Sequence, residues 1–182
     1  RFAIALSFLR TGLGLQSTPA NLVLISLALF MTFYVMSPAM EEAWSNGVKP
    51  LVENKISESE AFDKISKPFR AFMVAHVRDK DIRLFEDLRK PEKNTKGGES
   101  PALSVLVPAF MISELKRAFE IGFLLFLPFL IIDLVVASVL MSMGMMMLPP
   151  VVVSLPFKLI FFVLVDGWSL VAGSLVQSYG SG

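Results

Sequence analysis

Hydrophobic residues dominate the C-terminal part of the chain. Two long apolar runs, Ile121 to Leu148 and Val151 to Leu175, are separated by Pro149 and Pro150. Each run is long enough to cross the hydrocarbon core of a bilayer, which takes about 20 helical residues. Residues 121–182 carry only three formal charges, at Asp133, Lys158 and Asp166. The pattern predicts a membrane-associated helical hairpin with Pro149-Pro150 at its break.

The beginning of the chain is also apolar, but it is short. Residues 1–15 are too few and too charged to span a bilayer alone. We expect them to be the tail of an earlier helix that ends near Gly12 and Gly14, because glycine commonly terminates helices.

A second apolar helix is predicted over residues 21–39, which contain no charge. Ser17 or Thr18 is expected to cap its beginning, with Pro19 in the first turn. Ser37-Pro38 is expected to kink or end it, because the residue before a proline avoids the helical conformation.

Residues 41–100 have a different composition, with twelve acidic and twelve basic residues. Ser57 and Glu60 form the pattern of a capping box at a helix start. Helical spacing predicts a continuous apolar stripe, made by Phe62, Ile65, Phe69, Phe72 or Met73, and His76. Pro68 is expected to split or bend that helix. A short helix from Asp81 should place Ile82, Phe85 and Leu88 inward, followed by a loop over residues 90–100. A small helical module outside the membrane is predicted.

The chain then returns to apolar helices. We predict one long helix from about Ala109 to Met147, bent at Pro128, and a closing helix from about Pro156 to Val176. The expected organisation is an all-α protein in three segments: an N-terminal apolar segment over residues 1–40, a helical module over 41–104 and a bent hairpin over 105–182.

Methionines are concentrated near the break of the hairpin, at Met141, Met143, Met145, Met146 and Met147. Methionine is flexible and polarizable, so it suits surfaces that must adapt their shape. The cluster is dense, contains Gly144 and adjoins a proline pair, which favours a gate or constriction. Ordinary apolar packing is the alternative.

The three charges in the apolar region need partners, because ionised groups are costly at membrane depth. Lys158 and Asp166 are eight residues apart in the sequence, roughly 12 Å along a helix, too far for a direct bond. Glu114 or Asp133, on another helix or in another subunit, is expected to pair with Lys158. Glu114 is our preferred partner, inside the subunit or between subunits. These charges either hold an assembly together or form an ion-conducting relay.

Composition narrows the function classes. Apolar residues make up 54% of the chain, and the mean hydropathy is +0.63. The net charge of +1 gives no signal for nucleic-acid binding. Without cysteine, and with His76 as the single histidine, no metal site is predicted. No phosphate-binding or nucleophile motif is present, so we expect neither a cofactor nor an enzyme.

Several ordered blocks stand out in the sequence: PAFMISELK (108–116), FLPFLIIDLV (126–135), MGMMMLPP (143–150), LPFKL (155–159), FVLVDGW (162–168) and ALFMTFYVMSP (28–38). These blocks resemble the FliP family of the bacterial flagellar type III export apparatus. Residues 41–100 match only loosely. The resemblance covers nearly the whole chain, and these long ordered blocks are specific.

The resemblance implies the core subunit of an export gate in the bacterial inner membrane, within the flagellar basal body. Such a subunit forms a pentamer, is completed by FliQ and FliR, and works with other export-apparatus proteins and membrane lipid. Unfolded flagellar proteins would pass through its axis, which Met145, Met146 and Met147 would close as a gasket. Residues 41–104 would be periplasmic. A signal sequence and a further helix would precede the first residue.

The resemblance also implies that the apolar helices assemble largely above the membrane plane. That arrangement favours an assembly role for Asp133, Lys158 and Asp166. A paralogue from virulence type III secretion, a small ion or solute transporter and a membrane scaffold without a pore are the alternatives.

Overall fold

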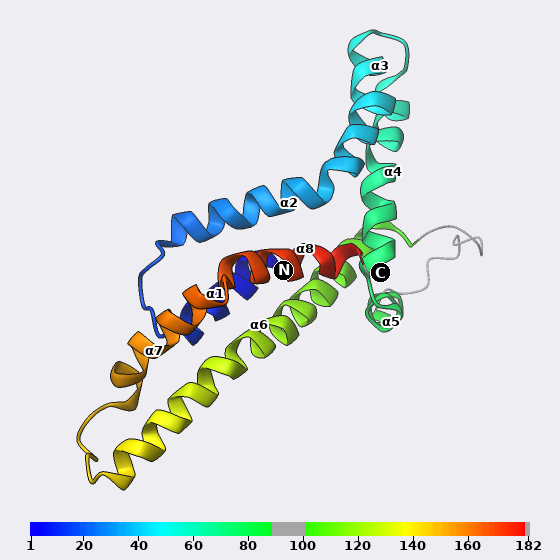
Figure 1. Cartoon of the computed structure of the whole chain (residues 1–182). Coiled ribbons are helices and arrows are strands. Elements are labelled where there is room, and N and C mark those ends of the chain that lie inside the picture. The colour runs from blue at the N-terminus through cyan, green and yellow to red at the C-terminus, as the bar shows by residue number, and fades with distance from the viewer. Residues whose placement is uncertain (89–100, 181–182) are drawn as a thin grey trace. The chain divides into compact units, whose positions relative to one another are not determined.

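The computed structural model describes residues 1–88 and 101–180, which contain helices and no strand. The elements are α1 (Phe2–Gly12), α2 (Asn21–Ala43), the π-helix η1 (Trp44–Val48), α3 (Lys49–Val52), α4 (Glu58–His76), α5 (Asp79–Leu88), α6 (Leu103–Ser142), α7 (Pro150–Leu164) and α8 (Gly167–Gly180) (Figure 1). The predicted all-α class is confirmed. The loop predicted over residues 90–100 lies outside the described residues.

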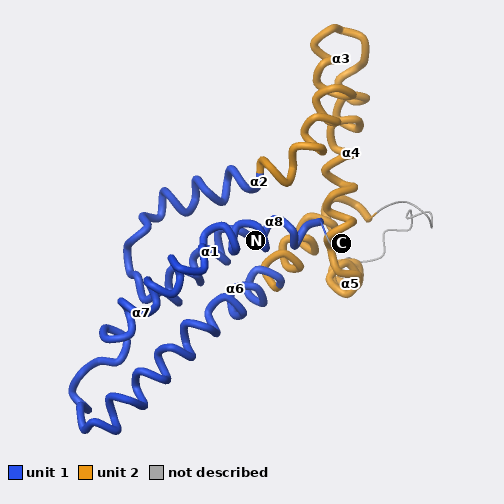
Figure 2. The backbone as a smooth tube through the Cα atoms, viewed as in Figure 1, with its two compact units in different colours: residues 1–32, 117–181 blue, residues 33–116, 182 orange. Residues whose placement is uncertain are grey.

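Two continuous helical stretches are long and apolar enough to cross a membrane. They are Asn21–Val52 and Leu103–Ser142, and α7 with α8 would form a third span if the bent pair counts as one. The chain forms two compact units, coloured separately in Figure 2. Unit 1 comprises residues 1–32 and 117–181, and unit 2 comprises residues 33–116. The long helices α2 and α6 therefore contribute to both.

Helix α1 supplies much of the core of unit 1. Its buried side chains follow helical spacing, and each is at most 4% exposed; they are Phe2, Ala5, Leu6 and Leu9. Arg1 lies over the ring of Tyr179, 3.7 Å from its centroid, and donates a hydrogen bond of 2.8 Å to the hydroxyl of Ser178. The beginning of α1 is therefore fixed to the end of α8.

Small residues allow α1 and α6 to approach closely. A Cβ atom at Gly122 would lie 2.6 Å from the Phe8 ring, and one at Gly12 would lie 2.9 Å from the Phe129 ring. Each glycine thus provides the space that a phenylalanine of the other helix fills. This pairing aligns α1 with the second half of α6.

The start of α2 differs from the prediction. The helix begins at Asn21, so Ser17 and Thr18 precede it by several residues and do not cap it. Arg10, near the end of α1, donates hydrogen bonds to the Pro19 carbonyl and the Asn21 side-chain oxygen. These bonds hold residues 19–21 at the helix entry, where we expected a serine or threonine cap. Pro38 does not end α2, which continues to Ala43.

The predicted closing helix is two helices. Helix α7 begins at Pro150, six residues before the predicted start at Pro156, and α8 follows at an angle of 66°. The break lies at Val165 and Asp166, and Asp166 has a left-handed backbone with φ of 51°. A Cβ atom at Gly167 would lie 2.2 Å from the Phe162 ring. The ring and the left-handed residue together set this corner.

In unit 2, helix α4 begins as predicted. The Ser57 hydroxyl accepts the backbone N–H of Glu60 at 3.3 Å, while the Glu60 carboxylate is 2.8 Å from Lys64. The Ser57 half of the predicted capping box is thus confirmed, while the Glu60 carboxylate forms an ion pair with Lys64 along the helix. Pro68 lies inside α4 without splitting it.

The apolar stripe of unit 2 is shorter than predicted. Leu88 is 72% exposed, so the inward placement predicted for it is wrong. Phe62 is 63% exposed within the chain, and its burial against a neighbouring subunit stays a prediction. The core is formed by Val77, Leu106 and Ala109, against which pack Met73, Ile82, Phe85 and Phe110. Helices α4 and α5 therefore meet α6 around their connecting turn, while the first half of α4 packs on η1, where a Cβ atom at Gly47 would lie 2.4 Å from the Ile65 side chain.

A polar cluster fixes the same turn. The Asp81 carboxylate accepts hydrogen bonds from the Ser113 hydroxyl at 2.6 Å and from Arg78 Nε at 2.8 Å. Ser113 also accepts the Arg78 backbone N–H at 3.1 Å. Burial opposes ionisation of Asp81. The hydrogen bonds from Ser113 and Arg78, with the charges of Arg78 and Lys80, outweigh it and place the pKa of Asp81 below its ordinary value.

We predict that acid weakens the attachment of α5 to α6. Because the folded-state pKa of Asp81 is lowered, its contribution to stability is complete above the unfolded pKa of about 3.9 and is lost as the pH falls through the folded value. The protection factors of the α5 amides, which are exchange rates corrected for the intrinsic pH dependence of exchange, should therefore fall below about pH 4 in the wild-type chain. In Asp81→Asn they should be lower already at neutral pH and nearly independent of pH. An unchanged acid dependence in this variant would show that another group is responsible.

Candidate functional site

The methionine cluster lies in the connection between α6 and α7. Helix α6 ends at Ser142, not at the predicted Met147, because Gly144 adopts a left-handed backbone with φ of 73°. The N–H of Gly144 donates to Met141 O at 3.1 Å, and the N–H of Met145 donates to Leu140 O at 2.9 Å. These two bonds define a Schellman motif, which terminates helices at glycine. We call residues 143–148 the Met turn.

The methionines of this region extend away from the chain's own core. Their exposed fractions rise toward the end of the cluster: 43% at Met145, 81% at Met146 and 98% at Met147. Met141 and Met143 are 58% and 61% exposed. In a helix, consecutive side chains point in directions about 100° apart and cannot all face one side. Met145–Met147 are not helical, so this limit does not apply to them. All three can face one partner.

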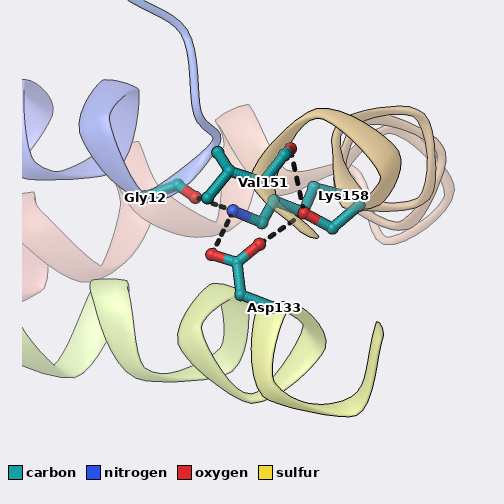
Figure 3. A network of polar contacts seen from close by, with 5 residues as sticks. Gly12, Asp133, Val151 and Lys158 are labelled. Atoms are coloured by element: carbon teal, nitrogen blue, oxygen red, sulfur yellow. Dashed lines mark hydrogen bonds and ion pairs between the residues drawn. The ribbon is translucent and has the colours of Figure 1, made fainter. Parts of the chain in front are cut away.

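A buried ion pair joins three helices of unit 1 (Figure 3). Lys158 on α7 is only 2% exposed, and its Nζ lies 2.6 Å from Asp133 Oδ2 on α6. The same ammonium donates a hydrogen bond of 3.1 Å to the carbonyl of Gly12 at the end of α1. The final carbonyls of a helix lack partners within the helix and attract cations. Lys158 therefore satisfies both a carboxylate and a helix end.

Ser154 completes the pair, and sequence analysis missed it. Its hydroxyl contacts the second oxygen of Asp133 and lies 3.1 Å from the Val151 carbonyl (Figure 3). Ser154 and Lys158 are four residues apart on α7, so both face α6. The sequence signal that could have identified Ser154 is this spacing, which places a hydroxyl one turn before the only lysine of an apolar helix.

The other two predicted charges have different surroundings. Within the chain, Lys158 pairs with Asp133. The preferred pairing with Glu114 is not made inside the chain, and between subunits it stays a prediction. Glu114 is 7% exposed on the part of α6 that belongs to unit 2. Asp166 is exposed at the corner between α7 and α8. In the described part of the chain, no group of three His, Cys, Asp or Glu residues is placed to hold a metal ion.

These features define the class: an all-helical membrane protein with apolar spans, an internal ion pair and an exposed methionine-rich turn. Within this class, the chain belongs to the FliP family, whose family model matches residues 1–175.

Curated relatives match almost the whole chain. The flagellar biosynthetic protein FliP of Caulobacter vibrioides is 59% identical, covering 100% of this chain and 68% of the relative. That of Rhizobium meliloti is 57% identical, covering 98% and 74%. That of Bacillus subtilis is 56% identical, covering 98% and 80%.

We predict strong coupling between Lys158 and Asp133. Removing one member strands a buried charge, which typically costs about 3–5 kcal/mol. Lys158→Met and Asp133→Leu should therefore each lower the thermal midpoint of the detergent-extracted protein, followed by circular dichroism. The double variant should lose much less than the sum of the two. Additive losses would mean that the two groups do not stabilise each other. Ser154→Ala, which leaves the ion pair in place, should cost about 1 kcal/mol.

Proposed function

We propose that this chain is the pore-forming subunit of the export gate of the bacterial flagellar type III secretion apparatus. Its membership of the FliP family supports a role as a component of the flagellar export apparatus. The relatives carry flagellar names, which favours the flagellar system over a virulence paralogue. Unfolded flagellar proteins are the proposed cargo, and the bacterial inner membrane is the proposed location.

The observation that carries the gate proposal is the exposure of the Met turn. An apolar side chain as exposed as Met147 is unfavourable in water, so such a cluster indicates a surface that another chain or a pore axis covers. Thioether side chains adapt to irregular neighbours. A ring of such turns can therefore close around an empty axis and re-form around a passing polypeptide.

The gate requires several chains around one axis. Large apolar side chains remain exposed on the parts of α2 and α6 that belong to unit 1 and on α7. Examples are Phe123 and Leu124 on α6 and Val152 and Leu164 on α7. Such faces suit helix packing between subunits. We propose a homopentamer completed by FliQ and FliR, in contact with membrane lipid and other export-apparatus proteins. The 41–104 module is proposed to lie in the periplasm, where its charged surface is solvated.

A transporter that uses Asp133, Lys158 and Asp166 as a relay is less well supported. The Lys158 ammonium is 2% exposed and is occupied by Asp133 and the Gly12 carbonyl. A relay group must exchange its proton or ion with a path, whereas this pair is enclosed by three helices. A structural role agrees better with that geometry.

We predict that replacing all three of Met145, Met146 and Met147 by alanine makes the gate leak. Each truncation removes two to three methylene equivalents, at about 0.8 kcal/mol for each buried CH₂. For three fully covered side chains the total is about 5 kcal/mol or more per subunit. Even a third of it exceeds the roughly 1.4 kcal/mol that corresponds to a factor of ten, so the closed state should be disfavoured by more than tenfold. Membrane permeability to small ions and solutes should rise in cells that produce the assembled variant complex.

Two comparisons make this test specific. Met111→Ala truncates a methionine that is 59% exposed on α6, and its permeability should equal that of the wild type. Both variants must yield the complex in wild-type amounts after detergent extraction, with the molecular mass of the wild-type complex. A sealed membrane with normal amounts of the triple variant would refute the gasket role.

A further inference from the structure

Asp166 occupies a corner that the chain constructs rigidly. The Phe162 ring fills the space beside Gly167, and the Trp168 ring meets Phe162 edge-on with centroids 5.3 Å apart. The N–H of Asp166 donates to Val163 O at 3.1 Å, and its own carbonyl accepts the N–H of Leu170 at 3.2 Å. The backbone on both sides of Asp166 is thus fixed, so the position of its side chain on the surface is set by the fold.

Backbone conformation explains the size of this residue but not its charge. With φ of 51°, position 166 lies in the left-handed region, which Gly, Asn and Asp tolerate best. An asparagine or a glycine would serve the turn equally well. Within the described ranges 1–88 and 101–180, no side chain bonds to the Asp166 carboxylate. The negative charge is favourable at the beginning of α8, which starts at Gly167, but no cation of the described residues pairs with it.

The surroundings of Asp166 would make an unpaired charge costly if another chain covered them. Val163 is 74% exposed, Leu164 is 80% exposed and Leu170 is 59% exposed, so the carboxylate sits in an apolar surface. Asp133 and Lys158 neutralise each other, which leaves Asp166 as the one uncompensated charge among residues 121–180. When this surface is covered, the carboxylate loses water and needs a cation in its place.

We propose that the corner around Asp166 docks an apolar helix of a neighbouring subunit that carries one lysine or arginine. The apolar side chains at 163, 164 and 170 pack against that helix, and its cation forms an ion pair with Asp166. Charge complementarity defines the partner. The surface carries one acidic residue among apolar ones, so the matching helix carries one basic residue among apolar ones. The inference rests on the proposed function, because it requires an assembly of several chains.

The test uses the full chain in its complex, in native membranes. Asp166→Asn and Asp166→Gly keep the left-handed turn and remove the charge, so the chain should fold normally. The amount of complex recovered after detergent extraction should fall by about tenfold or more, because a basic residue of the partner is left unpaired. Ser169→Ala, a change of an exposed polar residue in the next turn, is the matched control and should leave the amount unchanged.

Charge reversal then identifies the partner. Asp166→Lys should abolish assembly, and second-site changes that restore it should replace a lysine or arginine by an acid in an apolar helix of another subunit. Full assembly of Asp166→Asn would overturn the inference while leaving the gate proposal intact. Normal assembly of Asp166→Asn with loss of export would also overturn the inference, because it would indicate a proton site. Recovery of assembly on a change of lipid headgroup alone would overturn it as well, because it would indicate a lipid as the partner. A wild-type chain extracted only as a monomer would instead refute the gate proposal.

Discussion

The ion pair of Lys158 and Asp133 is the contact on which unit 1 depends. One ammonium fixes α7 to α6 through a carboxylate and fixes both to α1 through the Gly12 carbonyl. Apolar helices have few directional contacts, so many rotations of one against another are close in energy. A single buried charge selects one arrangement, because every other one strands it. The hairpin of α6 and α7 thus has a defined register, and the position of the Met turn follows from it.

Glycines supply the complementary constraint. Gly12 and Gly122 let α1 lie against α6 closely enough for Phe8 and Phe129 to fill the seam, which brings the Gly12 carbonyl to Lys158. A larger side chain at either glycine would separate the helices. Close packing and the polar contact therefore support each other. This agrees with the burial of α1, a helix too short and too charged to span a bilayer but well suited to the centre of a bundle.

Much of this arrangement follows from periodicity, and the differences have physical causes. Long apolar runs predicted α2, α6 and α7, and the Ser57 cap marked α4. The end of α6 at Ser142 depends on whether Gly144 adopts a left-handed turn, and several glycines of this chain do not. The α7–α8 corner depends on the Phe162 ring beside Gly167, a contact that sequence spacing does not reveal. The choice of Asp133 over Glu114 as partner within the chain also required the three-dimensional arrangement.

The two left-handed turns of the hairpin have the same consequence for assembly. At Gly144 the turn ends α6 and directs methionines outward, and at Asp166 the turn ends α7 and directs a carboxylate outward. Neither set of side chains packs into the core of the chain that carries it. The methionine side chains at the first turn suit a seal that must deform, since dispersion contacts re-form around any shape. The charged side chain at the second turn suits a contact that must be specific, since a carboxylate accepts only a cation or a hydrogen-bond donor when water is removed. A single hairpin thus presents an adaptable surface at one end and a selective surface at its corner, two properties that the proposed gate subunit would need.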